Sequence, residues 1–412
     1  MKRLKAMIVT TAIAGGALAA IPGTPAGAGH VQGPYFDLGA LPETDFDGKQ
    51  IFDGLKQFVA AYPYRLTGNP TEILAGQHLY DEMVALDYET SVVSLGLPVQ
   101  PPAPGVGLKA IRAIKRGTTR PNEWIMFVGH YDTVPQTIDG AYDNGAGTNL
   151  IRFLAKELAD VETNRSMVFT FYNGEEEGLL ASSRDASALQ AAGQQITAVL
   201  GFDMVGIAYP VANPNAGDYC LCLYRGANDG AVFDPLLRFV NYDFLELPEG
   251  NRLVRLAGAN IRNSDESSFA SRGYRTLRWA GMRTAGAYNG YHMPNDTIEN
   301  IVAVAGGEQY YEAGIENTMK SAYYTALAVD NHLPTLSANI DVIGSQASVA
   351  ATADDEDGPV GAVTIDWGDG DLTEGPSGSH TYAPGEYTLT VTVTDNLHPQ
   401  VTRSIEQTVV VS

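Results

Sequence analysis

The stretch SMVFTFYNGEEEGLLASSRDASALQAAG, residues 166–193, decides the predicted fold. It opens with an apolar run up to Tyr172 that is too continuous for a strand with one face in water. We therefore expect a strand that is buried on both faces of a sheet. The residues from Glu176 onward predict a helix. Glu177 is placed in the first turn of that helix, where the helix dipole favours acidic side chains.

The same alternation continues on both sides of this stretch. EWIMFVG, residues 123–129, predicts a second buried strand, and ITAVLGFDMVG, residues 196–206, predicts a third. Residues 145–160 between them have the pattern of a helix, because leucines recur every four residues from Leu150 to Leu158. Strands that alternate with helices indicate an α/β fold in which a mixed central sheet is sandwiched by helices.

The pattern changes in the last fifth of the chain. EYTLTVTVTD (386–395) and IEQTVVVS (405–412) alternate with period two, and turns rich in Gly, Asp and Pro separate such segments. This predicts a small all-β sandwich domain over residues 333–412, after an α/β domain over residues 48–332. The Gly- and Pro-rich residues 29–47 are expected to form an N-terminal arm.

The N-terminus has the features of an export signal. Lys2, Arg3 and Lys5 precede the apolar stretch AMIVTTAIAGGALAA (6–20), and small residues suited to cleavage follow it. We expect residues 1–28 to be a signal peptide and the protein to be secreted, outside the cell or into the periplasm. No later segment is apolar for long enough to span a membrane.

Composition narrows the class of protein further. At 44% hydrophobic and 18% charged residues the 412-residue chain is globular, and its net charge of −22 argues against nucleic acid as a partner. The two cysteines, Cys220 and Cys222, leave two states open: a strained disulfide or two buried thiols. With no histidine nearby they make a poor zinc site.

Side chains that bind metals follow the predicted strands. The carboxyl ends of strands in an open α/β sheet form the edge where ligands bind. The residues expected at this edge are His130, Asp132, Asp143, Glu175, Glu176, Asp203 and His292.

Two imidazoles with several carboxylates are a ligand set that zinc accepts. Five such ligands exceed what one tetrahedral zinc with an open position needs, and they suit two metals roughly 3.5–4 Å apart that share a carboxylate. Asp132 follows His130 by two residues, so on an extended chain both side chains point the same way. Asp132 is therefore placed to orient the histidine.

Each of these residues also has a structural alternative. A single histidine at a strand end is commonly a hydrogen-bonded structural residue, and Asp143 suits the cap of the helix that follows it. Glu175 and Glu176 suit a first helical turn. Because five candidates coincide at strand exits of one domain, the metal site is favoured, but the reaction is not identified by the ligands alone.

Six motifs together resemble the co-catalytic di-zinc aminopeptidases, a family with glutamate-carboxypeptidase-like and glutaminyl-cyclase-like relatives. In chain order the motifs are GHYDT, DNGAG, EEEGLLAS, FDMVG, SDESSFASRGY and YHMPNDT, and the upstream RLTGNP (65–70) resembles another segment of the same family. The resemblance covers about residues 48–330. It implies a zinc-dependent aminopeptidase that acts on peptides or proteins.

The resemblance also implies a role for each ligand. Asp143 bridges two Zn²⁺ ions, His130 and Asp203 complete one metal site, and Glu176 and His292 complete the other. The metals are expected to acidify a water and polarise the scissile carbonyl.

The remaining roles follow from the same motifs. Glu175 is the general base that passes a proton from water to the leaving amine. Asp132 and Asp265 belong to the outer shell, which surrounds the metal ligands without contacting the metals. Tyr291 is a candidate hydrogen-bond donor to the oxyanion and Arg262 a candidate substrate contact, although each is also compatible with an ordinary loop residue.

One residue departs from the family pattern. Relatives often carry a histidine or tyrosine where this chain has Glu266. The zinc ligands are unaffected, but the substrate contacts near Asp265 are expected to differ from those of the family.

The C-terminal segment resembles the polycystic-kidney-disease-type (PKD) β-sandwich. VTIDWGDGD, which contains Trp367, and SHTYAPGEYTLTVTVTDN carry the resemblance. It implies either binding to a surface or insoluble protein or a spacer role, and the residues do not decide between them.

Other functions remain as alternatives. On the same fold, a carboxypeptidase or a glutaminyl cyclase is possible, and the cyclases typically use one metal. A non-catalytic adhesin is disfavoured because every ligand position and Glu175 hold workable residues. The sequence has no HExxH, GxSxG or GxxxxGK[ST] motif, which argues against other zinc peptidases, serine hydrolases and nucleotide enzymes.

Overall fold

The computed structural model describes residues 44, 46–96, 107–207, 219–247, 254–257 (backbone only), 264–282, 287–331, 334–355, 360–395 and 402–411. The predicted signal peptide (1–28) and most of the predicted arm (29–47) lie outside these residues. The predicted domain boundary between residues 332 and 333 also lies outside them. These three assignments stay predictions.

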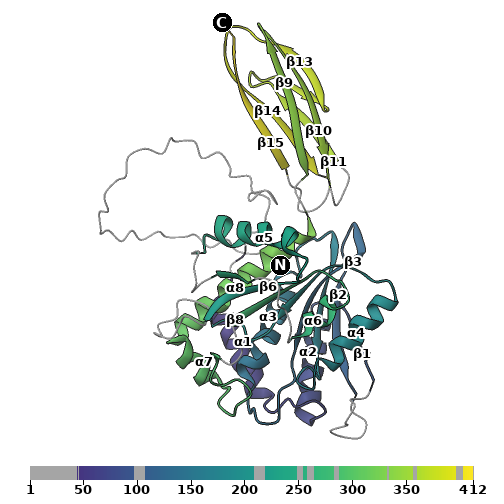
Figure 1. Ribbon diagram of the computed structural model, residues 1–412, viewed down its shortest axis with the longest axis vertical. Helices are drawn as coiled ribbons and strands as arrows, with labels where there is room; N and C mark the ends of the chain where they lie inside the picture. The colour runs from purple at the N-terminus through teal and green to yellow at the C-terminus, as the bar shows by residue number, and fades with distance from the viewer. Residues whose placement is uncertain are drawn as a thin grey trace, which may run out of the picture. The chain divides into compact units, whose positions relative to one another are not determined.

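An eight-stranded mixed sheet, ordered β1-β2-β4-β3-β5-β8-β6-β7, forms the centre of the first part of the chain (Figure 1). Its strands are β1 (Glu89–Ser94), β2 (Lys109–Lys115), β3 (Arg120–His130), β4 (Arg165–Tyr172), β5 (Gln195–Phe202), β6 (Tyr219–Arg225), β7 (Val254–Ala257) and β8 (Thr276–Met282). The inner strands β4, β3, β5 and β8 run parallel, whereas β2 and β6 pair antiparallel with β4 and β8. The predicted mixed sheet is confirmed.

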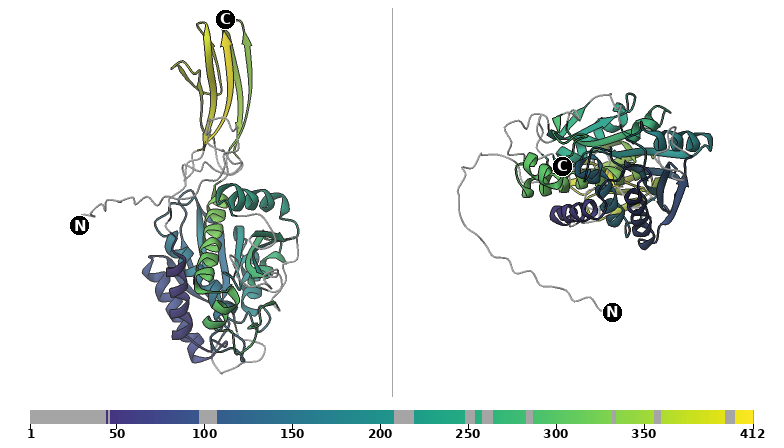
Figure 2. Two further views of the ribbon diagram at one scale, coloured as in Figure 1. Left: turned by 90° about the vertical axis from the view of Figure 1, so that its left-hand side faces the viewer. Right: turned by 90° about the horizontal axis from the view of Figure 1, so that it is seen from below.

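Helices cover both faces of this sheet (Figure 2). On one face the cluster of buried side chains includes residues of α1 (Gly48–Ala61), α2 (Pro70–Ala85), α3 (Gly147–Glu157), α5 (Gly230–Arg238), α7 (Ile298–Ala305) and α8 (Glu308–Asp330). On the other face α4 (Leu180–Ala191) and α6 (Asp265–Ala270) pack against the sheet. Among the described residues, no helix is both long and apolar enough to cross a membrane.

The inner strands are buried on both faces, as their apolar sequences predict. In β3, Ile125 and Phe127 belong to the cluster under α1 and α3, whereas Met126 and Val128 belong to the cluster under α4. Each such side chain contributes about 1.5–3 kcal/mol when it is fully buried. Two-sided burial fixes the register of the central strands, because a slip by one residue would exchange the two faces.

The connections around β3 position the functional site. β3 leads through α3 to β4 on one side, and β4 leads through α4 to β5 on the other side of β3. The helices α3 and α4 pack on opposite faces. The strand order thus reverses at β3, and such switch points leave a crevice for ligands at the carboxyl ends of the strands.

Two antiparallel sheets form the predicted β-sandwich. One has the order β13-β10-β9 and the other β12-β11-β14-β15. Their bounds are β9 (Thr335–Ile343), β10 (Gln346–Asp354), β11 (Val360–Asp366), β12 (Leu372–Glu374), β13 (Ser377–Thr381), β14 (Gly385–Asp395) and β15 (Thr402–Val411). Alternate residues of β14, Leu389 and Val391, join Trp367 in a shared core, which explains the period-two pattern.

Cys220 and Cys222 are joined as a disulfide in β6, and both side chains are fully buried. Their Cα atoms are 5.0 Å apart, within the reach of a disulfide. The pairing of β6 with β8 shifts register between Tyr219 and Cys222. Of the two states that the sequence left open, the structure contains the bonded one.

Candidate metal centre

The metal-binding side chains predicted from sequence converge at the carboxyl ends of the parallel strands. His130 is the last residue of β3, Glu175 and Glu176 follow β4, and Asp203 follows β5. His292 lies in the connection between β8 and α7. Because β4, β3, β5 and β8 are neighbours in the sheet, their ends meet at one edge.

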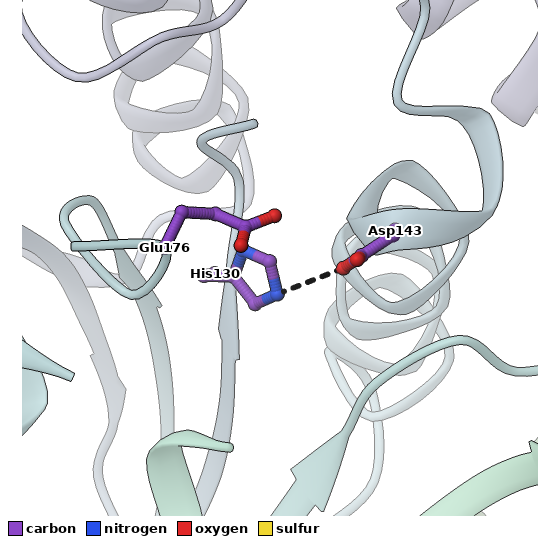
Figure 3. A group of neighbouring side chains, drawn as sticks. All are labelled: His130, Asp143 and Glu176. Atoms are coloured by element: carbon purple, nitrogen blue, oxygen red, sulfur yellow. Dashed lines mark ion pairs between the residues drawn. The ribbon is translucent and has the colours of Figure 1, made fainter. Parts of the chain in front are cut away.

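Asp143 lies between the two histidines. Its Oδ1 is 3.4 Å from His130 Nε2, and its Oδ2 is 3.4 Å from His292 Nε2. Figure 3 shows Asp143 reaching from one side toward His130 and Glu176 on the other. Each carboxylate oxygen of Asp143 therefore faces a different imidazole.

Each histidine also faces a second carboxylate. His130 Nε2 is 3.9 Å from Asp203 Oδ1, and His292 Nε2 is 3.1 Å from Glu176 Oε2. Two overlapping triplets, His130 with Asp143 and Glu176, and His130 with Glu175 and Asp203, hold ligand atoms within 4.8 Å of one another. By the ion-pair distances, the five predicted ligands form two groups that share Asp143, whereas the two triplets share His130 and one of them includes Glu175.

The donor set fits a cation. Glu176 Oε1 and Asp203 Oδ1 are buried and have no hydrogen-bond partner among the described residues. A buried polar atom without a partner costs about 1–3 kcal/mol, and more when it is charged. Carboxylate oxygen and imidazole nitrogen are zinc ligands, so bound Zn²⁺ would satisfy the atoms that the protein leaves unpaired.

The pKa values of the site residues are shifted because several carboxylates are buried close together. Burial raises the pKa of Glu176 to about 9, and the charge of Asp143 adds to the effect. Burial likewise raises the pKa of Glu175 well above its ordinary value. Burial alone would lower the pKa of His130, but the charge of Glu175 and other carboxylates raises it well above 6.5. A bound cation would replace protons in offsetting the negative charge, so metal binding is expected to release protons.

The turn that follows β4 differs from the prediction. α4 begins at Leu180, so Glu177 does not lie in a first helical turn; it is exposed in the preceding turn. Gly174 and Gly178 have φ angles of 69° and 100°, which non-glycine residues rarely adopt. These glycines favour a tight loop over a helix, and the loop aims Glu175 and Glu176 at the centre while Glu177 points to solvent.

Asp132 connects two of the ligand-bearing loops. Its Oδ1 is 3.4 Å from His130 Nδ1, and its two oxygens accept hydrogen bonds from the backbone N–H groups of Glu175 and Glu176, each at 3.4 Å. The Asp132 carboxylate is fully buried. It therefore orients the His130 ring and the glutamate loop together, in the position that the sequence indicates.

Asp296 is a positioning residue that the sequence argument missed. Its carboxylate accepts hydrogen bonds from Tyr142 N at 2.9 Å, Asp143 N at 3.0 Å and the Tyr288 hydroxyl at 2.9 Å. It ties the loop of His292 to the loop of Asp143. Its only sequence signal was membership of the YHMPNDT motif.

Asn144 makes a similar connection to the Asp203 loop. Its Nδ2 donates to Phe202 O at 2.8 Å, and its Oδ1 accepts from Met204 N at 3.3 Å. Phe202 and Met204 flank Asp203. Asn144 thus fixes the distance between Asp143 and Asp203, although the sequence argument assigned it no role.

The remaining predicted residues have different environments. Asp265 begins α6 and is buried, which raises its pKa to about 7. Glu266 is fully buried, and its Oε1 lies 3.7 Å from Arg278 Nε. The Tyr291 ring stacks on the His292 imidazole, with centroids 3.8 Å apart. Arg262 lies outside the described residues, so its predicted role stays a prediction.

Two families match separate parts of the chain. Residues 111–306 match Peptidase family M28, and residues 331–411 match the PKD domain. Both matches agree with the resemblances found in the sequence. The first covers the strands that carry the candidate metal ligands, from β3 to the His292 loop.

Curated relatives include peptidases. Aminopeptidase YwaD of Bacillus subtilis (strain 168) is 26% identical over 240 residues, which are 56% of this chain and 46% of the relative. Probable leucine aminopeptidase 2 of Aspergillus fumigatus is 35% identical over 117 residues, 28% of this chain and 21% of the relative. The chain thus spans less than half the length of each of these relatives.

Solved structures share the fold at low identity. The zinc aminopeptidase BSAP from Bacillus subtilis has a TM-score of 0.53 at 17% identity over 68% of this chain and 96% of that chain. Porphyromonas gingivalis glutaminyl cyclase has the same TM-score and identity over 67% of this chain and 97% of that chain. The fold is therefore common to aminopeptidases and cyclases.

Proposed function

Because residues 111–306 match Peptidase family M28 and residues 331–411 match the PKD domain, we propose that this chain is a zinc-dependent aminopeptidase. It removes the N-terminal residue of peptides by hydrolysis. We include export in the proposal, outside the cell or into the periplasm, on the evidence of the N-terminal signal pattern.

One observation carries the proposal: Asp143 faces a histidine with each of its oxygens. This arrangement, with Asp203 beside His130 and Glu176 beside His292, suits two metals that share one carboxylate. When bound, two Zn²⁺ ions supply Lewis-acid chemistry that acidifies water and polarises a carbonyl.

The chain's own residues then manage the protons. Glu175 accepts a proton from the attacking water and donates it to the amine that leaves. The hydrogen bonds from Glu175 N and Glu176 N to Asp132 hold this loop in place. In the proposal, Tyr291, whose ring stacks on the His292 imidazole, donates a hydrogen bond to the developing oxyanion.

The PKD domain has a separate proposed role. In the proposal it holds the enzyme near surface-bound or insoluble protein, and a spacer role remains the alternative. Removal of residues 333–412 distinguishes the two. Loss of turnover on an insoluble protein, with unchanged turnover on a short peptide, supports the binding role.

The test of the proposed function compares one peptide with a free and with an acetylated N-terminus. Full-length protein loaded with zinc should release residues stepwise from the free N-terminus and leave the acetylated peptide intact, as mass spectrometry of the products would show. A chelator should abolish the release. Release from the C-terminus would identify a carboxypeptidase, and no release from either peptide would favour a non-catalytic protein.

A glutaminyl cyclase is the second candidate, favoured by the cyclases among the structural neighbours. In that reaction the α-amine of an N-terminal glutamine attacks its own side-chain amide, and ammonia leaves. A peptide that begins with glutamine would then lose one ammonia without any cut in the chain. The shared position of Asp143 favours the aminopeptidase, because the cyclases typically use one metal.

A further inference from the structure

A segment far upstream of the metal ligands packs directly against the Asp132 loop. Arg65 Nε donates to Tyr131 O at 2.7 Å, and Thr133 N donates to Arg65 O at 3.1 Å. The residues on both sides of Asp132 are therefore bonded to Arg65. This segment, which contains RLTGNP, has no role in the mechanism described above.

Thr67 links this segment to both loops that surround the candidate general base. Its hydroxyl donates to Asp132 Oδ2 at 3.1 Å and accepts from Gly174 N at 3.1 Å. Gly174 immediately precedes Glu175. The Thr67 side chain is almost fully buried, so water cannot readily replace either bond.

The position of Thr67 is fixed from the other side by Glu72. Glu72 Oε2 accepts from Gly68 N at 3.1 Å, and Oε1 accepts from the Tyr131 hydroxyl at 2.5 Å. Lys109 Nζ lies 3.0 Å from the same Oε1 and offsets the buried charge. The bonds to Glu72 therefore hold the surroundings of Thr67 in a fixed arrangement, which a positioning side chain requires.

We propose that Thr67 is a positioning residue of the metal centre, which acts through Asp132 and Gly174. Its hydroxyl holds the Asp132 carboxylate against His130, and it holds the start of the loop that carries Glu175 and Glu176. This proposal rests on the proposed zinc site. The proposal requires no direct contact of Thr67 with metal or substrate.

The test replaces the hydroxyl without changing the shape of the side chain. Thr67→Val keeps the branched shape, removes the donor and acceptor, and leaves Asp132 Oδ2 and Gly174 N without this partner. Thr67→Ser keeps the hydroxyl and removes the methyl group. Thr318→Val is the matched control, because Thr318 is also buried and, among the described residues, its hydroxyl donates only to Gly314 O within α8, at 2.8 Å.

Two readouts separate positioning from general stability. Zinc affinity is measured on metal-free full-length protein by competition with a chromogenic chelator, and kcat and KM are measured on an aminoacyl anilide at saturating zinc. Loss of an outer-shell partner typically weakens metal binding or activity by about 10–100-fold, and we expect Thr67→Val to show this loss in zinc affinity and kcat. KM should stay unchanged, and Thr67→Ser and Thr318→Val should resemble the wild type.

Several results would overturn the proposal. If zinc affinity and kcat are the same in Thr67→Val and Thr318→Val, the Thr67 hydroxyl does not position the residues of the metal centre. An equal loss of zinc affinity and kcat in Thr67→Ser and Thr67→Val would assign the effect to the methyl group. If Thr67→Val does not fold, a loss of zinc affinity and kcat in Thr67→Ser would by itself contradict the proposal. If the wild type binds zinc but cleaves no anilide, the proposed function fails while the zinc affinities still decide the role of Thr67.

Discussion

Two clusters of histidine and aspartate in this molecule differ in what surrounds them. One is the centre built on His130, Asp143 and their neighbours, and the other is Asp369, Asp371 and His380 in the β-sandwich. Both hold ligand-type atoms within 4.8 Å of one another. The side chains of Asp143 and Asp203 are 7% and 6% exposed, whereas those of Asp369 and Asp371 are 24% and 75% exposed.

In the exposed cluster, the side chains of Asp369 and His380 already have bonding partners. His380 Nε2 is 2.7 Å from Asp369 Oδ2, and the His380 ring stacks on Trp367 with centroids 5.2 Å apart. Asp369 Oδ1 also accepts a hydrogen bond from Asp371 N at 3.2 Å. The buried cluster instead contains carboxylate oxygens without partners among the described residues. Burial and unmet bonding, more than residue type, therefore distinguish a metal centre from a surface cluster.

The largest effect should come from Glu175→Gln. The amide cannot accept the proton from water, so kcat should fall by about 10²–10⁴-fold, the usual contribution of a general base. Zinc content, measured by elemental analysis, should stay at the wild-type level. Glu177→Gln in the same turn is the control, because Glu177 is exposed and should be dispensable. A fully active Glu175→Gln variant would remove Glu175 from the proposed role.

The second effect concerns metal binding and contrasts the two clusters directly. His292→Ala removes the imidazole that faces Asp143 and Glu176, so this variant should bind one zinc fewer than the wild type. His380→Ala should leave the zinc content unchanged. Its free energy of unfolding should fall by about 1–3 kcal/mol, because the largely buried His380 side chain loses its contact with Asp369 and its stacking on Trp367. Equal zinc loss in both variants would contradict the distinction between the clusters.

A further effect is a pH dependence of the stability of the metal-free protein. The folded state holds a proton on Glu176 up to a pKa of about 9, whereas the ordinary glutamate value is 4.5. Between these values the folded state binds more protons, so its stability should fall as pH rises. The raised pKa of His130 acts in the same direction. Thermal unfolding of metal-free protein between pH 5 and 8 checks this, and added zinc should remove the trend.

The parts of the fold with a regular apolar pattern could be predicted from sequence. Continuous apolar runs, typical of strands that are buried on both faces, indicated β3, β4 and β5. The leucines at every fourth residue from Leu150 to Leu158 indicated α3. The convergence of the candidate metal ligands at one edge of the sheet could also be predicted, because each follows such a strand or belongs to a motif. The turn after β4 was misjudged because the positive φ angles of Gly174 and Gly178 determine the local conformation there.

The supporting residues were beyond the reach of the sequence argument. Thr67 meets Asp132 across 65 positions, and Asp296 meets Tyr142 across 154. No periodicity or spacing pairs residues that are so far apart in the chain. Their roles appear only once the strand order brings their loops together.

The number of zinc ions bound per chain distinguishes a two-metal centre at Asp143 from a single metal site or none. Metal-free full-length protein should be titrated with Zn²⁺, and the bound metal determined by elemental analysis after removal of the excess. Two bound ions are expected in the wild type and two in His380→Ala. One ion would favour a cyclase-like centre, and no bound ion would contradict the assignment of a metal centre at Asp143.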